Sequence, residues 1–205
     1  MIVYRAKELD ITLGRTHPWT IAGYDANCSY IDFREEPERI VSSLEDFQEW
    51  AEYAATQRFY DLIRWLNGAD SLFETNDTAF SIEPNCTPDQ PYKLQASGRL
   101  MLFPSDMRLT CATGFAEWMM ARFHFHLAQI QPPLAAAAVG ISRAPCLFKS
   151  ANAKGDEVVL YFWAWGNTND TTMSILDKVF DRLRMAAEKV NDDVRESLRG
   201  SANRS

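Results

Sequence analysis

The sequence predicts an α+β fold: a single domain with a mainly antiparallel sheet and about three helices packed against it. Three observations lead to this class. Apolar residues recur at helical spacing over 43–67, 114–131 and 171–190. Between these segments, pairs of short stretches alternate apolar and polar residues, which is typical of hairpins. The chain lacks the regular strand–helix alternation that a Rossmann-like fold or a barrel requires.

The first 33 residues mix β-branched and aromatic residues with turn formers, which predicts two or three short strands. The clearest helical pattern follows them. Ser43 is suited to cap a helix, Asp46 adds a carboxylate to its first turn, and Gly68 ends the apolar stripe. We therefore expect one helix over about 43–67.

A second row on this helix has a different composition from the apolar stripe. It contains Trp50, Tyr53, Gln57, Tyr60 and Arg64, again at spacings of three and four. One interpretation is a helix that packs on two sides within the domain. The other is a partner or dimer surface, because tyrosine, tryptophan and arginine often anchor protein interfaces.

The middle of the chain predicts strands. The stretch 72–82 has a polar interruption at Glu74–Thr78, where Asn76 and Asp77 sit. This interruption indicates either a bulge or turn held by side-chain hydrogen bonds, or a recognition loop carried by a rigid strand. Further along, 92–96 and 99–103 alternate as strands, and the Ser97–Gly98 pair between them predicts a two-residue hairpin turn.

Residues 114–131 show a helical stripe that contains a short strand-like alternation; the longer pattern favours a helix. Strands are then predicted over 139–148 and 157–165. The second of these is apolar on both faces, which is typical of a central strand covered on both sides. If one face is open instead, Tyr161, Trp163 and Trp165 line a groove for an apolar ligand or a partner.

The last predicted helix, 171–190, has an ordinary core-facing stripe. Residues 191–205 are mostly polar, so we expect a frayed or disordered tail there. The domain is accordingly expected to span residues 1–190.

Composition excludes several classes of function. The chain has 205 residues and a formal charge of −7, with no cluster of Lys and Arg, which weighs against nucleic-acid binding. Its longest apolar runs are too short to cross a membrane, and its start does not match a signal peptide. No two cysteines form a CxxC pair, so we predict reduced, mostly buried thiols and a cytoplasmic protein. The cysteines are Cys28, Cys86, Cys111 and Cys146.

Few residues suit catalysis. His124 and His126 could share a metal ion on a strand, but on a helix they point apart, so we predict neither a metal nor a cofactor. His126 is a candidate acid–base group if a carboxylate orients its ring. Cys111 could pair with either histidine as a nucleophile, although nothing nearby indicates an activated thiol.

These observations favour a cytoplasmic protein-binding module over an enzyme. An immunity protein or an inhibitor that neutralises its partner has this acidic, compact character, and a basic partner would be attracted by the charge. The alternative is a small enzyme, or an enzyme subunit, with an aromatic-lined pocket and His126 or His124 as the acid–base group. A homodimer formed through the aromatic row of the first helix is compatible with both.

Overall fold

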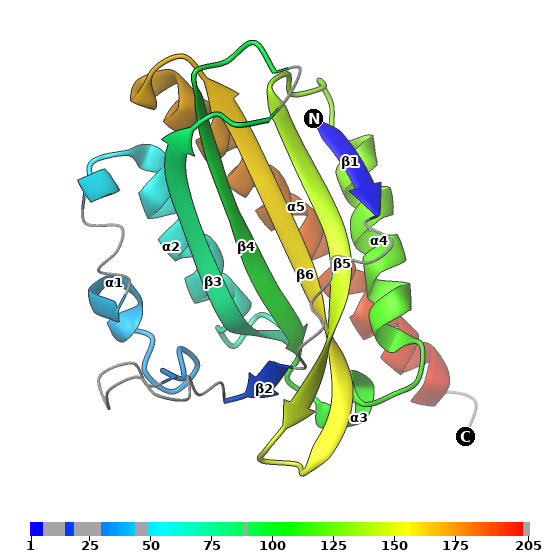
Figure 1. The fold of residues 1–205 in the computed structure, drawn as a ribbon. Helices are drawn as coiled ribbons and strands as arrows, with labels where there is room; N and C mark the ends of the chain where they lie inside the picture. The colour runs from blue at the N-terminus through cyan, green and yellow to red at the C-terminus, as the bar shows by residue number, and fades with distance from the viewer. Residues whose placement is uncertain (6–14, 19–29, 44–48, 88–89, 203–205) are drawn as a thin grey trace.

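A computed structural model describes residues 1–5, 15–18, 30–43, 49–87 and 90–202. It contains a sheet and a layer of helices, which confirms the α+β class (Figure 1). The elements follow in the order β1 (Ile2–Arg5), β2 (Arg15–His17), α1 (Arg39–Ser43), α2 (Ala54–Leu66), β3 (Phe73–Pro84), β4 (Leu94–Pro104), α3 (Met107–Thr110), α4 (Phe115–Gln129), β5 (Ala137–Phe148), β6 (Ala153–Gly166) and α5 (Asn169–Ala202).

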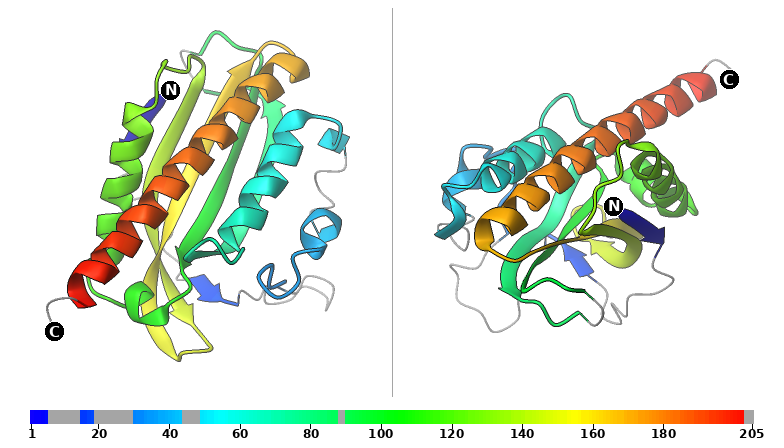
Figure 2. Two further views of the ribbon diagram at one scale, coloured as in Figure 1. Left: turned by 180° about the vertical axis from the view of Figure 1, so that it is seen from behind. Right: turned by 90° about the horizontal axis from the view of Figure 1, so that it is seen from above.

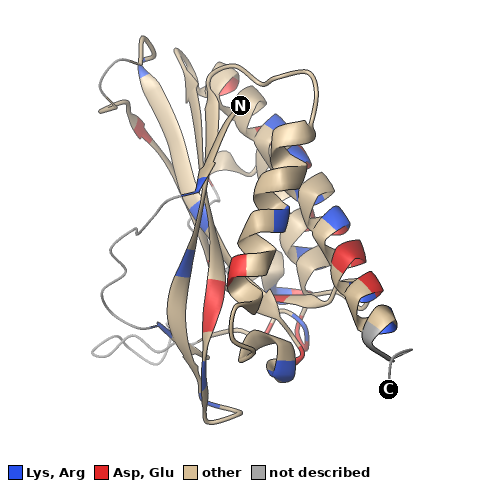
Figure 3. Ribbon diagram, turned by 90° about the vertical axis from the view of Figure 1, so that its right-hand side faces the viewer, with Lys and Arg blue, Asp and Glu red and all other residues tan. Residues whose placement is uncertain are grey.

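The sheet has the strand order β1-β5-β6-β4-β3, and β2 also pairs with β5. The pairs β3/β4, β4/β6 and β5/β6 are antiparallel, whereas β1 and β2 run parallel to β5. The helices α2, α4 and α5 lie together on one face of the sheet, as Figures 2 and 3 show from behind and edge-on. We call the opposite face of the sheet the open face.

Aromatic rings fill the space between the sheet and the helices. Phe180 of α5 lies with its ring centroid 4.8 Å from Phe59 of α2 and 5.0 Å from Phe162 of β6. All three side chains are completely buried. Burial of one large side chain stabilises the fold by about 1.5–3 kcal/mol, so this contact fixes the two helices on the sheet.

The N-terminal prediction of short strands is confirmed for β1 and β2. The remainder of residues 1–33 that lies in 6–14 and 19–29 falls outside the described residues. Residues 44–48 of the predicted first helix also fall outside them.

The single helix predicted over 43–67 is wrong for residues 49–53, because α2 begins only at Ala54. Tyr53, just before it, has extended backbone angles (φ −82°, ψ 138°) that interrupt a helix. The Thr56 hydroxyl donates to the backbone oxygen of Trp50 at 2.7 Å, so a side chain bonds a carbonyl group just ahead of the first turn. The helical spacing of α2 therefore does not extend back through residues 49–53.

The predicted hairpin turn at Ser97–Gly98 is also wrong, since β4 runs through both residues without a break. Gly98 pairs with Phe80 on one side and Phe162 on the other. A Cβ atom at Gly98 would lie 2.1 Å from the Ala79 carbonyl oxygen. The glycine therefore permits close strand packing and does not form a turn.

The helices predicted over 114–131 and 171–190 are confirmed by α4 and α5, but the frayed tail is not. Helix α5 continues to Ala202, and Val194 is only 1% exposed. The polar residues that suggested a tail bind other parts of the fold. None of the helices within the described ranges has the length and apolar character that a membrane span requires.

Candidate functional site

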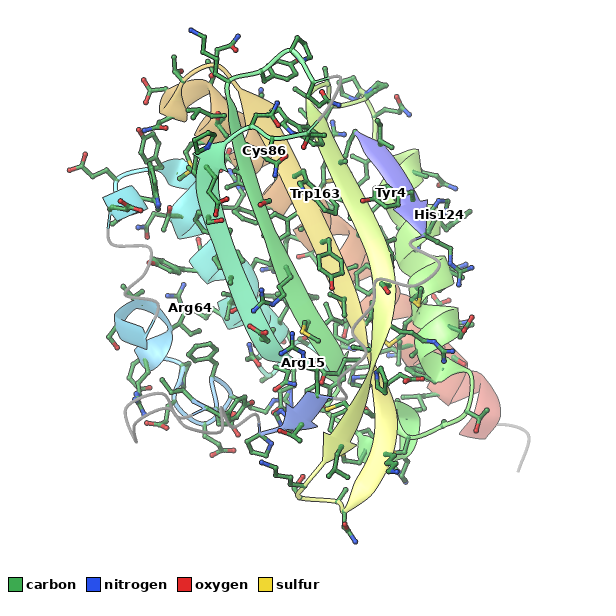
Figure 4. The ribbon with its side chains drawn as sticks, in the orientation of Figure 1. Tyr4, Arg15, Arg64, Cys86, His124 and Trp163 are labelled. Carbon is green, nitrogen blue, oxygen red and sulfur yellow. The ribbon has the colours of Figure 1, made fainter. Side chains whose placement is uncertain are left out.

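The upper part of the open face carries three aromatic side chains in a row. Tyr4 of β1 stacks on Trp163 of β6 with ring centroids 6.1 Å apart, and Tyr161 stacks on the same indole at 6.2 Å. Tyr4 is 40% exposed, and the other two are half-buried. Figure 4 shows Tyr4 and Trp163 at this place on the sheet. We call these three residues the aromatic ladder.

The strand pattern explains how the aromatic ladder forms. Tyr161 and Trp163 are two residues apart in β6, so both side chains emerge on the same face. Tyr4 is opposite Gly140 of β5, and a Cβ atom at that glycine would lie 3.0 Å from the tyrosine ring. The missing side chain therefore lets the Tyr4 ring lie across β5 and reach the indole.

A hollow of about 300 Å³ adjoins the aromatic ladder. Tyr161 and Trp163 line one part of it, and Arg99, Ser97 and Ser81 line the rest together with neighbouring backbone. This volume is at the lower limit for ligand pockets, so the hollow suits one planar side chain better than a large cofactor.

Trp165 follows the same alternation but is not part of this surface. Its side chain is 6% exposed, and its indole N–H donates to Gln95 Oε1 at 2.9 Å. The Thr87 hydroxyl donates to the same oxygen at 2.5 Å. The predicted groove is therefore formed by Tyr161 and Trp163 alone among the three residues proposed for it.

Two guanidinium groups beside the hollow share one carboxylate. Arg99 holds Asp77 Oδ2 at 2.8 and 2.9 Å, and Arg15 lies 4.0 Å from the same oxygen. Burial raises the pKa of Tyr161, against the attraction of these two arginines. Among these three side chains, two are positive and one is negative, although the chain as a whole is acidic, and Arg99 is the one that lines the hollow.

The polar interruption in β3 is a bulge, as one of the two interpretations predicts. Pairing with β4 shifts register between Thr75 and Thr78. Bulges let successive residues face one side of a sheet. Asn76 bonds His17 of β2, and the next residue, Asp77, bonds Arg99 of β4 on the open face.

Below the aromatic ladder, β2 covers a buried polar cluster of His17, Glu74, Asn76 and Glu157. The two ring nitrogens of His17 lie 3.2 Å from Asn76 Oδ1 and 3.2 Å from Glu74 Oε1. The Asn76 amide donates to Glu157 Oε1 at 2.7 Å. His17 and Asn76 are 7% and 6% exposed, and Glu157 is completely buried. These bonds fasten β2 to the sheet.

Burial dominates the chemistry of this polar cluster. It raises the pKa of Glu157, and hydrogen bonds from Cys146 and Asn76 offset this only in part. Burial beside Glu157 also raises the pKa of the Cys146 thiol, which therefore lacks the thiolate character of a nucleophile. Glu157 Oε2 and Arg15 Nε are buried without a hydrogen-bond partner in the described part of the chain.

Glu157→Gln is expected to change how stability depends on pH. Just above its ordinary pKa of 4.5, Glu157 stays protonated in the folded chain but ionises in the unfolded one. The folded state then binds more protons, so rising pH costs the wild type stability. Glutamine removes this loss. Relative to the wild type, the variant should gain more than about 0.5 kcal/mol between about pH 4 and pH 8, beyond the range of surface substitutions.

Urea denaturation at a series of pH values measures this gain. Glu117→Gln removes a carboxylate whose side chain is 51% exposed and serves as the matched control. Parallel pH profiles for the wild type and Glu157→Gln would show that burial of Glu157 costs nothing.

His126 has the carboxylate partner that an acid–base role requires, but a third residue shares it. Asp193 Oδ2 lies 2.7 Å from His126 Nε2 and accepts from Arg122 Nε at 2.6 Å. Asp193 is partly desolvated, yet these hydrogen bonds lower its pKa. Since Asp193 belongs to α5 and the other two residues to α4, the group joins the two helices.

The other catalytic and cysteine predictions have mixed outcomes. Helix α4 contains both His124 and His126, as predicted, and Figure 4 shows His124 on that helix, away from Trp163. Cys111 is half-buried. Within the described ranges, no group of three or more His, Cys, Asp or Glu residues could hold a metal ion. Cys86 is exposed, contrary to the expectation of mostly buried thiols, and Cys28 lies outside the described residues.

The aromatic row predicted on the first helix does not form one surface. Tyr60 is 2% exposed and belongs to the core, whereas Arg64 is exposed and bonds Asp61 at 2.5 Å. Trp50 and Tyr53 precede α2 and pack partly against the core, with the Tyr53 hydroxyl donating to Asp170. The helical spacing that joined these four residues is interrupted at Tyr53.

A second hollow, of about 430 Å³, lies between α2 and α5. Its charged lining residues are Arg58, Asp61, Asp181 and Arg184. Arg58 bonds Asp181 at 3.2 Å and Asp177 at 2.6 Å, so it is already neutralised. The paired charges make this hollow a weaker candidate than the one beside the aromatic ladder.

The structure thus brings together Tyr161, Trp163 and Asp77 of the predicted binding residues. Sequence reasoning missed Tyr4 and Arg99, which complete the same surface. The alternation of β4 would have placed Arg99 on the face of Ser97, but the N-terminal strand offered no signal of its partner. No protein-family model, curated protein or solved structure matches this chain.

Proposed function

We propose that this chain is a protein-binding module of the cytoplasm and that the upper open face binds another protein. The main supporting observation is the aromatic ladder, which combines the exposed Tyr4 with the half-buried Tyr161 and Trp163 and lies beside Ile2, itself 63% exposed. Contiguous exposed apolar groups on a protein surface commonly mark interaction sites. Tyrosine, tryptophan and arginine, the residue types of this face, are the usual anchors of interfaces. An inhibitor or an immunity protein acts through such binding alone.

Fewer observations support an enzymatic function. The His126–Asp193 pair is its best candidate, but Arg122 already occupies the carboxylate oxygen that would orient the ring. The hollow beside the aromatic ladder is lined by Tyr161, Trp163 and Arg99, and no histidine lines it. Tyrosine, tryptophan and arginine are the residue types that anchor protein interfaces, so the lining of the hollow supports binding.

Trp163→Ala should abolish most of this binding. A partner captured from the native host with the tagged wild type is purified, and its affinity for each variant is measured by calorimetry. Loss of a central tryptophan typically costs an interface about 2 kcal/mol or more, which corresponds to binding weakened by about thirtyfold or more. Phe125→Ala is the matched control, since Phe125 is 46% exposed on α4.

Three results would contradict the proposal. One is a purified partner that binds Trp163→Ala as tightly as the wild type. Another is equal weakening by Phe125→Ala, which would place the interface elsewhere. The third is self-association in sedimentation equilibrium that Trp163→Ala abolishes, because the open face would then bind a second copy. Circular dichroism must first show that each variant is folded.

A further inference from the structure

We infer that the partner presents an aromatic side chain next to a carboxylate group. The ring would occupy the hollow against Tyr161 and Trp163, and the carboxylate would bind Arg99 and Arg15. This inference rests on the proposed function and adds the chemistry of the partner's contact residues.

The aromatic part follows from the shape and the lining of the hollow. Its volume of about 300 Å³ admits one side chain. The ring planes of Tyr161 and Trp163 differ by only 22°, and those of Tyr4 and Trp163 by 23°. An aromatic ring from the partner can pack against these nearly parallel rings in offset-stacked or edge-to-face geometry.

The carboxylate part follows from the charges at the edge of the hollow. Arg99 and Arg15 both approach Asp77 Oδ2, and their side chains are 38% and 40% exposed. Asp77 can neutralise only one of these two guanidinium groups, and Glu157, another carboxylate that interacts with Arg15, is completely buried away from the surface. A guanidinium group binds a carboxylate through paired hydrogen bonds, so a second carboxylate would complete the charge balance.

This local charge differs from the expectation for the whole chain. The net charge of −7 suggests a basic partner. At contact distance, however, a lysine or arginine entering this hollow would meet Arg99, which lines it, with Arg15 close to the same Asp77 carboxylate. Charges separated by more than about 10 Å are largely screened at ordinary salt, so the local groups decide what binds.

The test uses two small probes that differ only in charge. N-acetylphenylalanine carries the ring and the carboxylate, whereas N-acetylphenylalanine amide carries the ring alone. Nitrogen–proton spectra follow the Trp163 indole N–H, which is assigned by its absence in Trp163→Phe. We expect saturable shifts of this signal, with the acid bound about five- to tenfold more tightly than its amide.

Arg99→Gln should remove this preference for the acid while both probes still shift the indole signal. Arg108→Gln removes the same charge from a side chain that is 90% exposed on α3, and it should keep the preference. Because Arg99→Gln leaves Asp77 with only the more distant Arg15, circular dichroism checks its fold. Arg15→Gln, which leaves the Arg99–Asp77 pair intact, should weaken the preference in the same direction.

Equal binding of the acid and the amide, or no shift of the Trp163 signal with either probe, would overturn the inference. The proposed function is judged separately. A partner whose affinity depends on Trp163 but not on Arg99 or Arg15 would keep the binding module and exclude the acidic contact. A partner whose affinity does not depend on Trp163 would exclude both the proposed binding face and the acidic contact.

Discussion

Gly98→Ala is expected to lower the free energy of unfolding by about 3 kcal/mol or more, the upper range for a substitution that overpacks a core. The new Cβ atom would lie 2.1 Å from the Ala79 carbonyl oxygen and 2.6 Å from the Phe162 ring. Since Ala79 contributes backbone, β3 must move away from β4 or the core ring must leave its place. Urea denaturation followed by circular dichroism measures the loss.

Gly140→Ala is the matched control, because the same change there meets a side chain that can move. Its Cβ atom would lie 3.0 Å from the outer end of the Tyr4 ring. That ring is 40% exposed and can turn outward, so the loss of stability should be less than half that of Gly98→Ala. If Gly98→Ala is as stable as Gly140→Ala, β3 and β4 do not approach each other at Gly98 as closely as the structure indicates.

Gly98 also shows why part of the fold escaped prediction. A serine–glycine pair between two alternating stretches is the sequence pattern of a two-residue hairpin. The same pair occurs in a central strand whose neighbour brings a large ring against it, and Phe162 is 64 residues away in the chain. A local pattern cannot distinguish the two cases, whereas the β5/β6 hairpin was predicted because both strands and their connection are local.

The candidate site divides in the same way. Tyr161 and Trp163 could be placed on one face because alternation along a strand needs no partner. Tyr4 pairs with Gly140 in a parallel arrangement across more than a hundred residues, and the sequence near either residue does not indicate this pairing. The bulge at Asn76 and Asp77 was one of two predicted interpretations. Its outcome depended on His17 and Arg99, which only the fold brings there.

Removal of residues 191–205 tests the largest correction to the predicted domain. A chain that ends at Val190 should lose about 3–5 kcal/mol, from the burial of Val194 and two hydrogen bonds of Asn191. Asn191 Oδ1 accepts from the Leu72 backbone N–H at 2.8 Å, and its amide donates to the Asp70 carbonyl oxygen at 3.3 Å. For a chain of this size, that loss lowers the melting temperature by roughly 10 °C.

A chain that ends at Leu198 separates these contacts from a general effect of shortening. It keeps Asn191 and Val194, together with Asp193 and its bonds to α4, and lacks residues 199–205, which include the last turn of α5. Leu198 is itself 42% exposed, so this chain should melt within about 2 °C of the full length, which corresponds to about 0.5–1 kcal/mol. Equal melting temperatures for the full chain and the chain ending at Val190 would instead support the sequence-based prediction that residues 191–205 form a frayed tail. The end of α5 fastens the 70–72 turn and α4, and the polar residues responsible are those whose composition suggested disorder.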